Sequence, residues 1–177
     1  LKKFNNIKSI FFDLDGTLFD TAPELCFATN QMLKDLDLQE LENDIVISFI
    51  GKGADNLIRK SILYSSQKDS EALFKKARKL FDKYYILNAA QSLPYDGVEE
   101  TLMKLKKKKL SLACVTNKPE IYTHAILEKS GLISYLDLVV SGDTVIRKKP
   151  DPMPLQYSCD KLKVEPNQVI MVGDSCN

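Results

Sequence analysis

Short apolar runs rich in β-branched and aromatic residues occur near the N-terminus and again in the second half of the chain. Four of them are typical of buried strands: Ile7–Leu14, Leu110–Thr116, Leu136–Ser141 and Val169–Gly173. Amphipathic periodicity predicts helices before or between the later runs: Gly97–Lys108, Pro119–Gly131 and Pro152–Leu162. Strands that alternate with helices indicate right-handed βαβ units and a parallel sheet.

Residues 20–92 follow a different pattern, with helical periodicity and no convincing strand run. Pro23 suits the first turn of a helix, and further helices are predicted over Ala54–Leu63 and Glu71–Leu87. We therefore expect an α/β, Rossmann-like parallel-sheet core formed by residues 1–19 and 93–177. An all-helical insertion, residues 20–92, interrupts this core.

Composition limits the classes of function without selecting one. Of the 177 residues 44% are hydrophobic, and 25 Lys and Arg nearly balance 24 Asp and Glu. A net charge of +1 argues against a protein that binds nucleic acid through bulk charge. No apolar run approaches the roughly 18 residues that a membrane-spanning helix needs. We expect neither a nucleic-acid nor a membrane partner.

The cysteines argue against a zinc site, because none of the four belongs to a CxxC pair. They are Cys26, Cys114, Cys159 and Cys176. In an otherwise ordinary, Lys-rich sequence they are typical of reduced thiols, which predicts a cytoplasmic protein.

Candidate chemistry gathers where the predicted strands end, the edge at which open α/β sheets bind ligands. The first strand run leads into Asp13-Leu14-Asp15-Gly16-Thr17. Two carboxylates two residues apart point to the same side of an extended chain, which is costly unless a cation lies beside them. A plain Asp-Gly turn is the ordinary alternative, but the position of the Asp13–Thr17 motif directly after an apolar strand favours a functional site.

The other three strand runs lead into polar groups that suit a phosphate ester, the third through Ser141-Gly142-Asp143 to the loop that contains Lys149. Thr116 and Asn117 offer a hydroxyl and an amide for a phosphoryl oxygen, Lys149 offers a cation, and Asp174 offers a third carboxylate for a magnesium site. Taken singly, they also fit a helix N-cap, a basic surface loop and a turn. Their occurrence together at four strand ends predicts one site on one rim of the sheet.

These motifs resemble the signature of the haloacid dehalogenase-like hydrolase superfamily, which reads DxDGT, hydrophobic-Thr, Lys-Pro and GDS. The matching segments are Asp13–Thr17, Val115-Thr116, Lys149-Pro150 and Gly173–Ser175. The helical insertion resembles the α-helical cap of one subclass. Within the superfamily, Asp13–Pro23 and Phe49–Leu57 are most similar to the phosphoglycolate phosphatase family.

The resemblance implies a role for each motif residue. Asp13 attacks phosphorus and becomes an aspartyl phosphate, while Asp15 protonates the leaving group and then activates water. Mg²⁺ is held by the carboxylates of Asp13 and Asp174 and by the backbone carbonyl of Asp15. Thr116 and Lys149 bind the phosphoryl oxygens, and Lys149 also orients Asp13 and neutralises its charge. The implied substrate is a small phosphorylated metabolite, 2-phosphoglycolate, which is hydrolysed to glycolate and phosphate.

Specificity and assembly are less constrained by the sequence. Lys52, between two glycines of the insertion, is placed to meet a substrate carboxylate, although a solvent-facing loop lysine has the same pattern. A sugar-phosphate mutase, another small-metabolite phosphatase and a non-catalytic phosphate-binding protein remain alternatives, and the protein is expected to be a monomer or homodimer. The family continues beyond the GDS motif, so we expect a longer native protein with more core than these 177 residues.

Overall fold

The computed structural model describes residues 6–67, 70–89 and 91–175. The chain divides into two compact units. We call Leu1–Asp20 together with Leu93–Asn177 the core unit, and Thr21–Ser92 the helical unit.

The core unit is built on a four-stranded parallel sheet with strand order β5-β4-β1-β6. The strands are β1 (Ser9–Phe12), β4 (Ser111–Val115), β5 (Leu138–Val140) and β6 (Val169–Val172). They lie within the four apolar runs, which confirms the predicted α/β fold class. Because all four strands are parallel, their carboxyl ends reach the same edge of the sheet.

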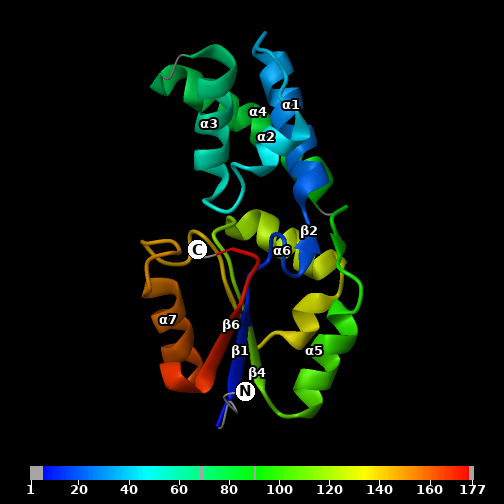
Figure 1. Ribbon diagram of the computed structural model, residues 1–177, viewed down its shortest axis with the longest axis vertical. Helices are drawn as coiled ribbons and strands as arrows, with labels where there is room; N and C mark the ends of the chain where they lie inside the picture. The colour runs from blue at the N-terminus through cyan, green and yellow to red at the C-terminus, as the bar shows by residue number, and fades with distance from the viewer. Residues whose placement is uncertain (1–5, 68–69, 90, 176–177) are drawn as a thin grey trace. The chain divides into compact units, whose positions relative to one another are not determined.

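Alternating side chains of the strands bury both faces of this sheet. Phe11, Ala113 and Val140 form a fully buried cluster on one face, and α7 (Met153–Leu162) packs there through residues such as Leu155. Helix α5 (Val98–Lys107) also packs on β4, and Figure 1 shows it on the other side of the sheet from α7. The remaining core elements are α6 (Glu120–Lys129) and the short 3₁₀ helices η1 (Leu132–Tyr135) and η2 (Pro166–Gln168).

A second, two-stranded sheet marks the boundary of the insertion. Strand β2 (Phe19–Asp20) pairs antiparallel with β3 (Leu93–Pro94), so the two crossings out of the core unit lie side by side. Hydrophobic periodicity did not predict these strands, because two residues are too few to show a period.

The helical unit contains α1 (Ala22–Asp35), α2 (Asn43–Ile47), α3 (Ala54–Ser66) and α4 (Glu71–Ala89). Helices α1 and α4 pack along each other, as Figure 1 shows. The short helix α2 was not predicted from the sequence. None of the helices described is long and apolar enough to cross a membrane.

Three of the four cysteines are buried free thiols: Cys26, Cys114 and Cys159. Cys176 lies outside the described residues. Burial raises the pKa of the Cys114 thiol far above its ordinary value, and the negative charge of Asp13 acts in the same direction.

Candidate active site

The loop after β1 turns sharply around the carbonyl of Leu14. This oxygen accepts hydrogen bonds from the backbone N–H groups of Leu18 and Phe19, both at 3.0 Å. Gly16 adopts φ +74°, a left-handed conformation that a residue with a Cβ rarely takes. The Leu14 and Phe19 side chains are fully buried, so they anchor the loop that carries both candidate carboxylates.

Asp13 lies at the centre of the strand-end rim. Its Oδ1 accepts the Leu14 backbone N–H at 2.8 Å, and its Oδ2 lies 2.8 Å from Nζ of Lys149. Burial raises the pKa of Asp13 above its ordinary value, and the Lys149 ammonium and the Leu14 hydrogen bond oppose that shift. The carboxylate is thus held on both oxygens by a buried cation and a backbone donor.

Asp15 has a buried cation of its own. Its Oδ1 accepts a hydrogen bond from Nζ of Lys118 at 2.6 Å, and the Lys118 side chain is only 3% exposed. Across the described parts of the chain, Lys118 and Lys149 are the only buried basic residues, and each pairs with one carboxylate of the Asp13–Asp15 motif.

Sequence reasoning missed Lys118. A signal for it was present, because Lys118 precedes Pro119 just after β4 in the same way that Lys149 precedes Pro150 in the loop after β5. Both lysines belong to Lys-Pro pairs in loops that follow strand ends. Their position after strand ends therefore distinguishes these two lysines from the lysines on helix surfaces. Residue type alone does not distinguish them.

The Thr116–Lys118 segment follows β4 and is buried throughout. The Thr116 backbone N–H donates to the Val140 carbonyl at 2.9 Å, and its hydroxyl accepts the Lys118 backbone N–H at 3.2 Å. Asn117 binds the backbone of Lys149 on both sides: Nδ2 donates to the Lys149 carbonyl and Oδ1 accepts the Lys149 N–H, both at 2.9 Å. The structure therefore brings the predicted residues Thr116, Asn117 and Lys149 together.

The loops after β4 and β5 touch through their backbones. The Gly142 N–H donates to the Lys118 carbonyl at 2.7 Å, and a Cβ placed on Gly142 would lie 2.1 Å from the Asn117 carbonyl oxygen. Only glycine permits this approach, because that distance is far inside van der Waals contact. The contact fixes the spacing of two of the strand ends that form the site.

Asp174 follows β6 and lies against the loop after β1. A Cβ placed on Gly16 would lie 2.5 Å from Asp174 Oδ2, so the missing side chain makes room for this carboxylate. Within residues 6–67, 70–89 and 91–175, no three His, Cys, Asp or Glu side chains are close enough together to hold a metal ion. The acidic side chains near the rim therefore do not by themselves form a metal cage.

Three buried polar atoms near the strand ends have no hydrogen-bond partner among the residues that the structure describes. They are Thr17 Oγ1, Ser141 Oγ and Lys149 Nζ. Lys149 Nζ lies at ion-pair distance from Asp13, but the direction of approach does not meet hydrogen-bond geometry. Buried polar groups are normally satisfied, so an ammonium in this position is suited to bind an anionic ligand.

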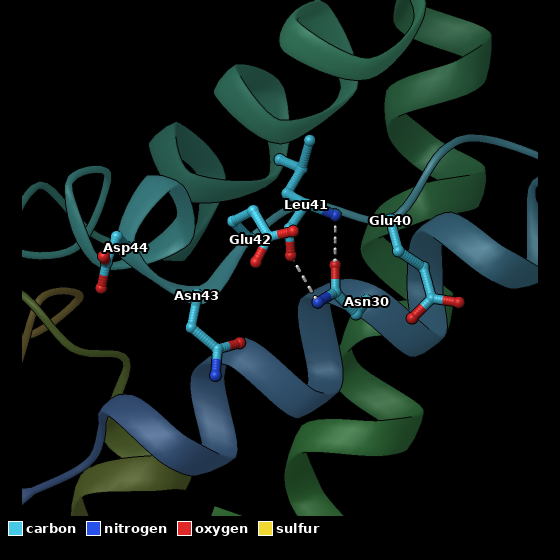
Figure 2. Close-up of a pocket in the computed structure, with 6 residues that line it drawn as sticks. All are labelled: Asn30, Glu40, Leu41, Glu42, Asn43 and Asp44. Atoms are coloured by element: carbon cyan, nitrogen blue, oxygen red, sulfur yellow. Dashed lines mark hydrogen bonds between the residues drawn. The ribbon is translucent and has the colours of Figure 1, made fainter.

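Lys52 belongs to the other unit. It lies exposed in the Gly51–Gly53 loop before α3, and both flanking glycines have positive φ. The helical unit also contains an acidic pocket of about 430 Å³ between α1 and α2, shown in Figure 2. The pocket is lined by Asn30 and Glu40–Asp44, so it contains none of the predicted site residues.

Comparison with known proteins gives consistent matches. The family model described as haloacid dehalogenase-like hydrolase matches residues 10–177. The phosphoglycolate phosphatase of Nitrosospira multiformis is 42% identical over 174 residues, which cover 97% of this chain and 76% of that protein. That of Thiobacillus denitrificans is 37% identical over 175 residues, with coverage of 97% and 76%. The crystal structure of a predicted phosphoglycolate phosphatase from Haemophilus somnus superposes with a TM-score of 0.92 at 35% identity, covering 96% of this chain and 78% of that one.

Proposed function

The chain belongs to the haloacid dehalogenase-like hydrolase family and is a phosphoric monoester hydrolase, and we propose that it hydrolyses 2-phosphoglycolate to glycolate and phosphate. The substrate proposal is supported by relatives with 36–42% identity that carry the name phosphoglycolate phosphatase. The observation that carries the chemistry is the pairing of Asp13 with Lys149 and of Asp15 with Lys118. Two buried cations allow two neighbouring carboxylates to face an anionic phosphate ester.

In the proposed first step, an Asp13 oxygen forms a bond to phosphorus as the bond from phosphorus to the alkoxide oxygen breaks. Asp15 enters this step as the carboxylic acid and gives its proton to the leaving alkoxide, which leaves a carboxylate beside the Lys118 ammonium. In the second step, water attacks the phosphorus of the aspartyl phosphate while Asp15 takes a proton from that water. The bond between phosphorus and the Asp13 oxygen breaks, which releases phosphate. Asp13 is then a carboxylate again, and Asp15 is again the carboxylic acid.

Phosphoryl transfer depends mainly on positioning and on neutralisation of charge. We propose that the Lys149 ammonium contacts both Asp13 and a phosphoryl oxygen, since its Nζ has no hydrogen bond to a described residue. The Thr116 hydroxyl already accepts the Lys118 N–H, so its own proton is the group that would donate to the phosphoryl group.

We propose Mg²⁺ as the cofactor, with the carboxylates of Asp13 and Asp174 and the backbone carbonyl of Asp15 as protein ligands. These donors are all oxygens, which Mg²⁺ prefers, and the set needs only two acidic side chains. The cradle that Gly16 leaves for Asp174 supports this assignment. When bound, Mg²⁺ would supply positive charge to the phosphoryl group.

The proposal is tested by phosphate release from 2-phosphoglycolate with and without Mg²⁺. Asp13→Asn removes the nucleophile, so we expect kcat to fall by at least about 10³-fold. Asp160→Asn, the same change at an exposed position of α7, should leave kcat unchanged. Full activity of Asp13→Asn would refute the mechanism. An enzyme that hydrolyses other phosphate esters but not 2-phosphoglycolate would refute the proposed substrate. Transfer of phosphate within a sugar phosphate, with no phosphate released, would refute it as well.

A further inference from the structure

Lys149 has its ammonium at the site, but it reaches that site from a long loop. Strand β5 ends at Val140, and the intervening segment includes Ile146, whose side chain is 96% exposed. Such a loop needs a fixed point near its end if the Lys149 ammonium is to stay 2.8 Å from Asp13.

The Asn117 carboxamide is placed to provide it. It donates to the Lys149 carbonyl and accepts the Lys149 N–H, both at 2.9 Å, so it holds the peptide groups on both sides of the Lys149 Cα. Asn117 and Lys149 are both 5% exposed, and the two hydrogen bonds are buried. The clamp joins residues that are 32 positions apart in the sequence.

Asn117 is itself held rigidly. It follows β4 directly after Thr116, whose N–H bonds to the end of β5, and its carbonyl oxygen lies against Gly142 in a space too small for a Cβ. The anchor for the Lys149 loop is therefore part of the sheet edge. A displacement of about 1 Å in a catalytic group is enough to cost on the order of 100-fold in rate.

We propose that Asn117 is a positioning residue that acts on the reaction through Lys149, by fixing the backbone from which the Lys149 ammonium reaches Asp13 and the phosphoryl group. This inference rests on the proposed phosphatase function. It differs from the expectation drawn from the sequence, in which the Asn117 amide binds a phosphoryl oxygen itself.

A double-mutant cycle separates these two roles, because a residue that acts through Lys149 has nothing to act through once that ammonium is gone. Asn117→Ala is expected to lower kcat/KM by about 10- to 100-fold in the wild-type background. In the Lys149→Met background the same change should alter kcat/KM by less than about 3-fold. An undiminished loss in that background would overturn the proposal, because it would mean direct contact with substrate.

The helical unit supplies a matched control. Figure 2 shows that the Asn30 carboxamide clamps the backbone of Leu41 in the same way, with both hydrogen bonds at 2.9 Å. Asn30→Ala therefore removes a pair of hydrogen bonds with the same lengths and directions, although less buried, and should lower Tm while leaving kcat/KM unchanged. A fall in kcat/KM as large as that of Asn117→Ala would count against a specific role for Asn117.

Three further measurements keep the test decisive. If Asn117→Ala lacks the native circular dichroism spectrum, Asn117→Ser, which retains one hydrogen-bonding group, takes its place in the cycle with the same criterion. If Lys149→Met is inactive, the cycle is measured on the Kd for inorganic phosphate. Every rate is also measured with p-nitrophenyl phosphate. A wild type that is inactive only on 2-phosphoglycolate refutes the proposed substrate, while the cycle still decides the role of Asn117.

Discussion

Replacing Lys118 with Met removes the charge from a buried ion pair while keeping most of the apolar stem. The Lys118 and Asp15 side chains are only 3% and 17% exposed, so the Asp15 carboxylate would lose this ammonium in a site that water reaches poorly. Breaking a buried ion pair by removing one partner typically costs about 3–5 kcal/mol. Because Asp15 keeps some contact with water, we expect Lys118→Met to lower the free energy of unfolding by about 2–4 kcal/mol.

An exposed ion pair with the same N···O distance serves as the control. Lys104 Nζ lies 2.6 Å from Glu100 Oε1, the distance also found between Lys118 and Asp15, but these side chains are 66% and 68% exposed. Exposed pairs of this kind contribute at most about 1 kcal/mol, so Lys104→Met should be nearly neutral. The two variants thus differ in burial and not in distance.

The assay is thermal and urea unfolding followed by circular dichroism. For a chain of this length, each 1 kcal/mol shifts Tm by roughly 2–4 °C, so Lys118→Met should lose about 4–16 °C and Lys104→Met no more than about 4 °C. Adding Asp15→Asn to Lys118→Met should recover part of the loss, because it removes the negative charge that the Lys118 ammonium faced. Equal shifts for the two lysine variants, or no recovery in the double variant, would refute the reasoning.

Two further predictions concern the rim and the substrate carboxylate. Gly142→Ala places a Cβ against the Asn117 carbonyl oxygen, so it should lower the free energy of unfolding, measured in urea, by about 1–3 kcal/mol and also lower kcat/KM. Gly131→Ala is the control, because its Cβ would have no heavy atom within 4 Å and the variant should lose stability only through the positive φ of this position. A Gly142→Ala protein with native stability would contradict the close approach. The hypothesis from the sequence that Lys52 meets the substrate carboxylate predicts that Lys52→Ala raises KM for 2-phosphoglycolate about 10-fold and leaves KM for p-nitrophenyl phosphate, which has no carboxylate, unchanged. Equal KM values for wild type and variant on 2-phosphoglycolate would exclude that hypothesis.

The parts of the fold that depend on local pattern were predictable from the sequence. Buried strands such as β1 and β4 appear as apolar runs, and long helices such as α4 show a clear period. The two-residue strands β2 and β3 and the short helix α2 were not predicted, because such short elements are stabilised by contacts from outside their own segment.

For the site, the sequence alone determined which chemical groups are available, and it placed Asp13, Thr116 and Asp174 at strand ends because their motifs directly follow apolar runs. Lys149 instead follows the third run through a loop. The family resemblance implied the pairing of Lys149 with Asp13, but only the tertiary structure decided the partners of Asp15 and Asn117. Lys118 meets Asp15 across 103 positions, and Asn117 holds Lys149 across 32. Pairing of this kind depends on strand order and on burial, which are properties of the whole sheet. A lysine that is buried against a carboxylate and a lysine on a helix surface are the same residue in the sequence and can have similar local patterns. Their burial and their ion-pair partners differ only once distant strands come together.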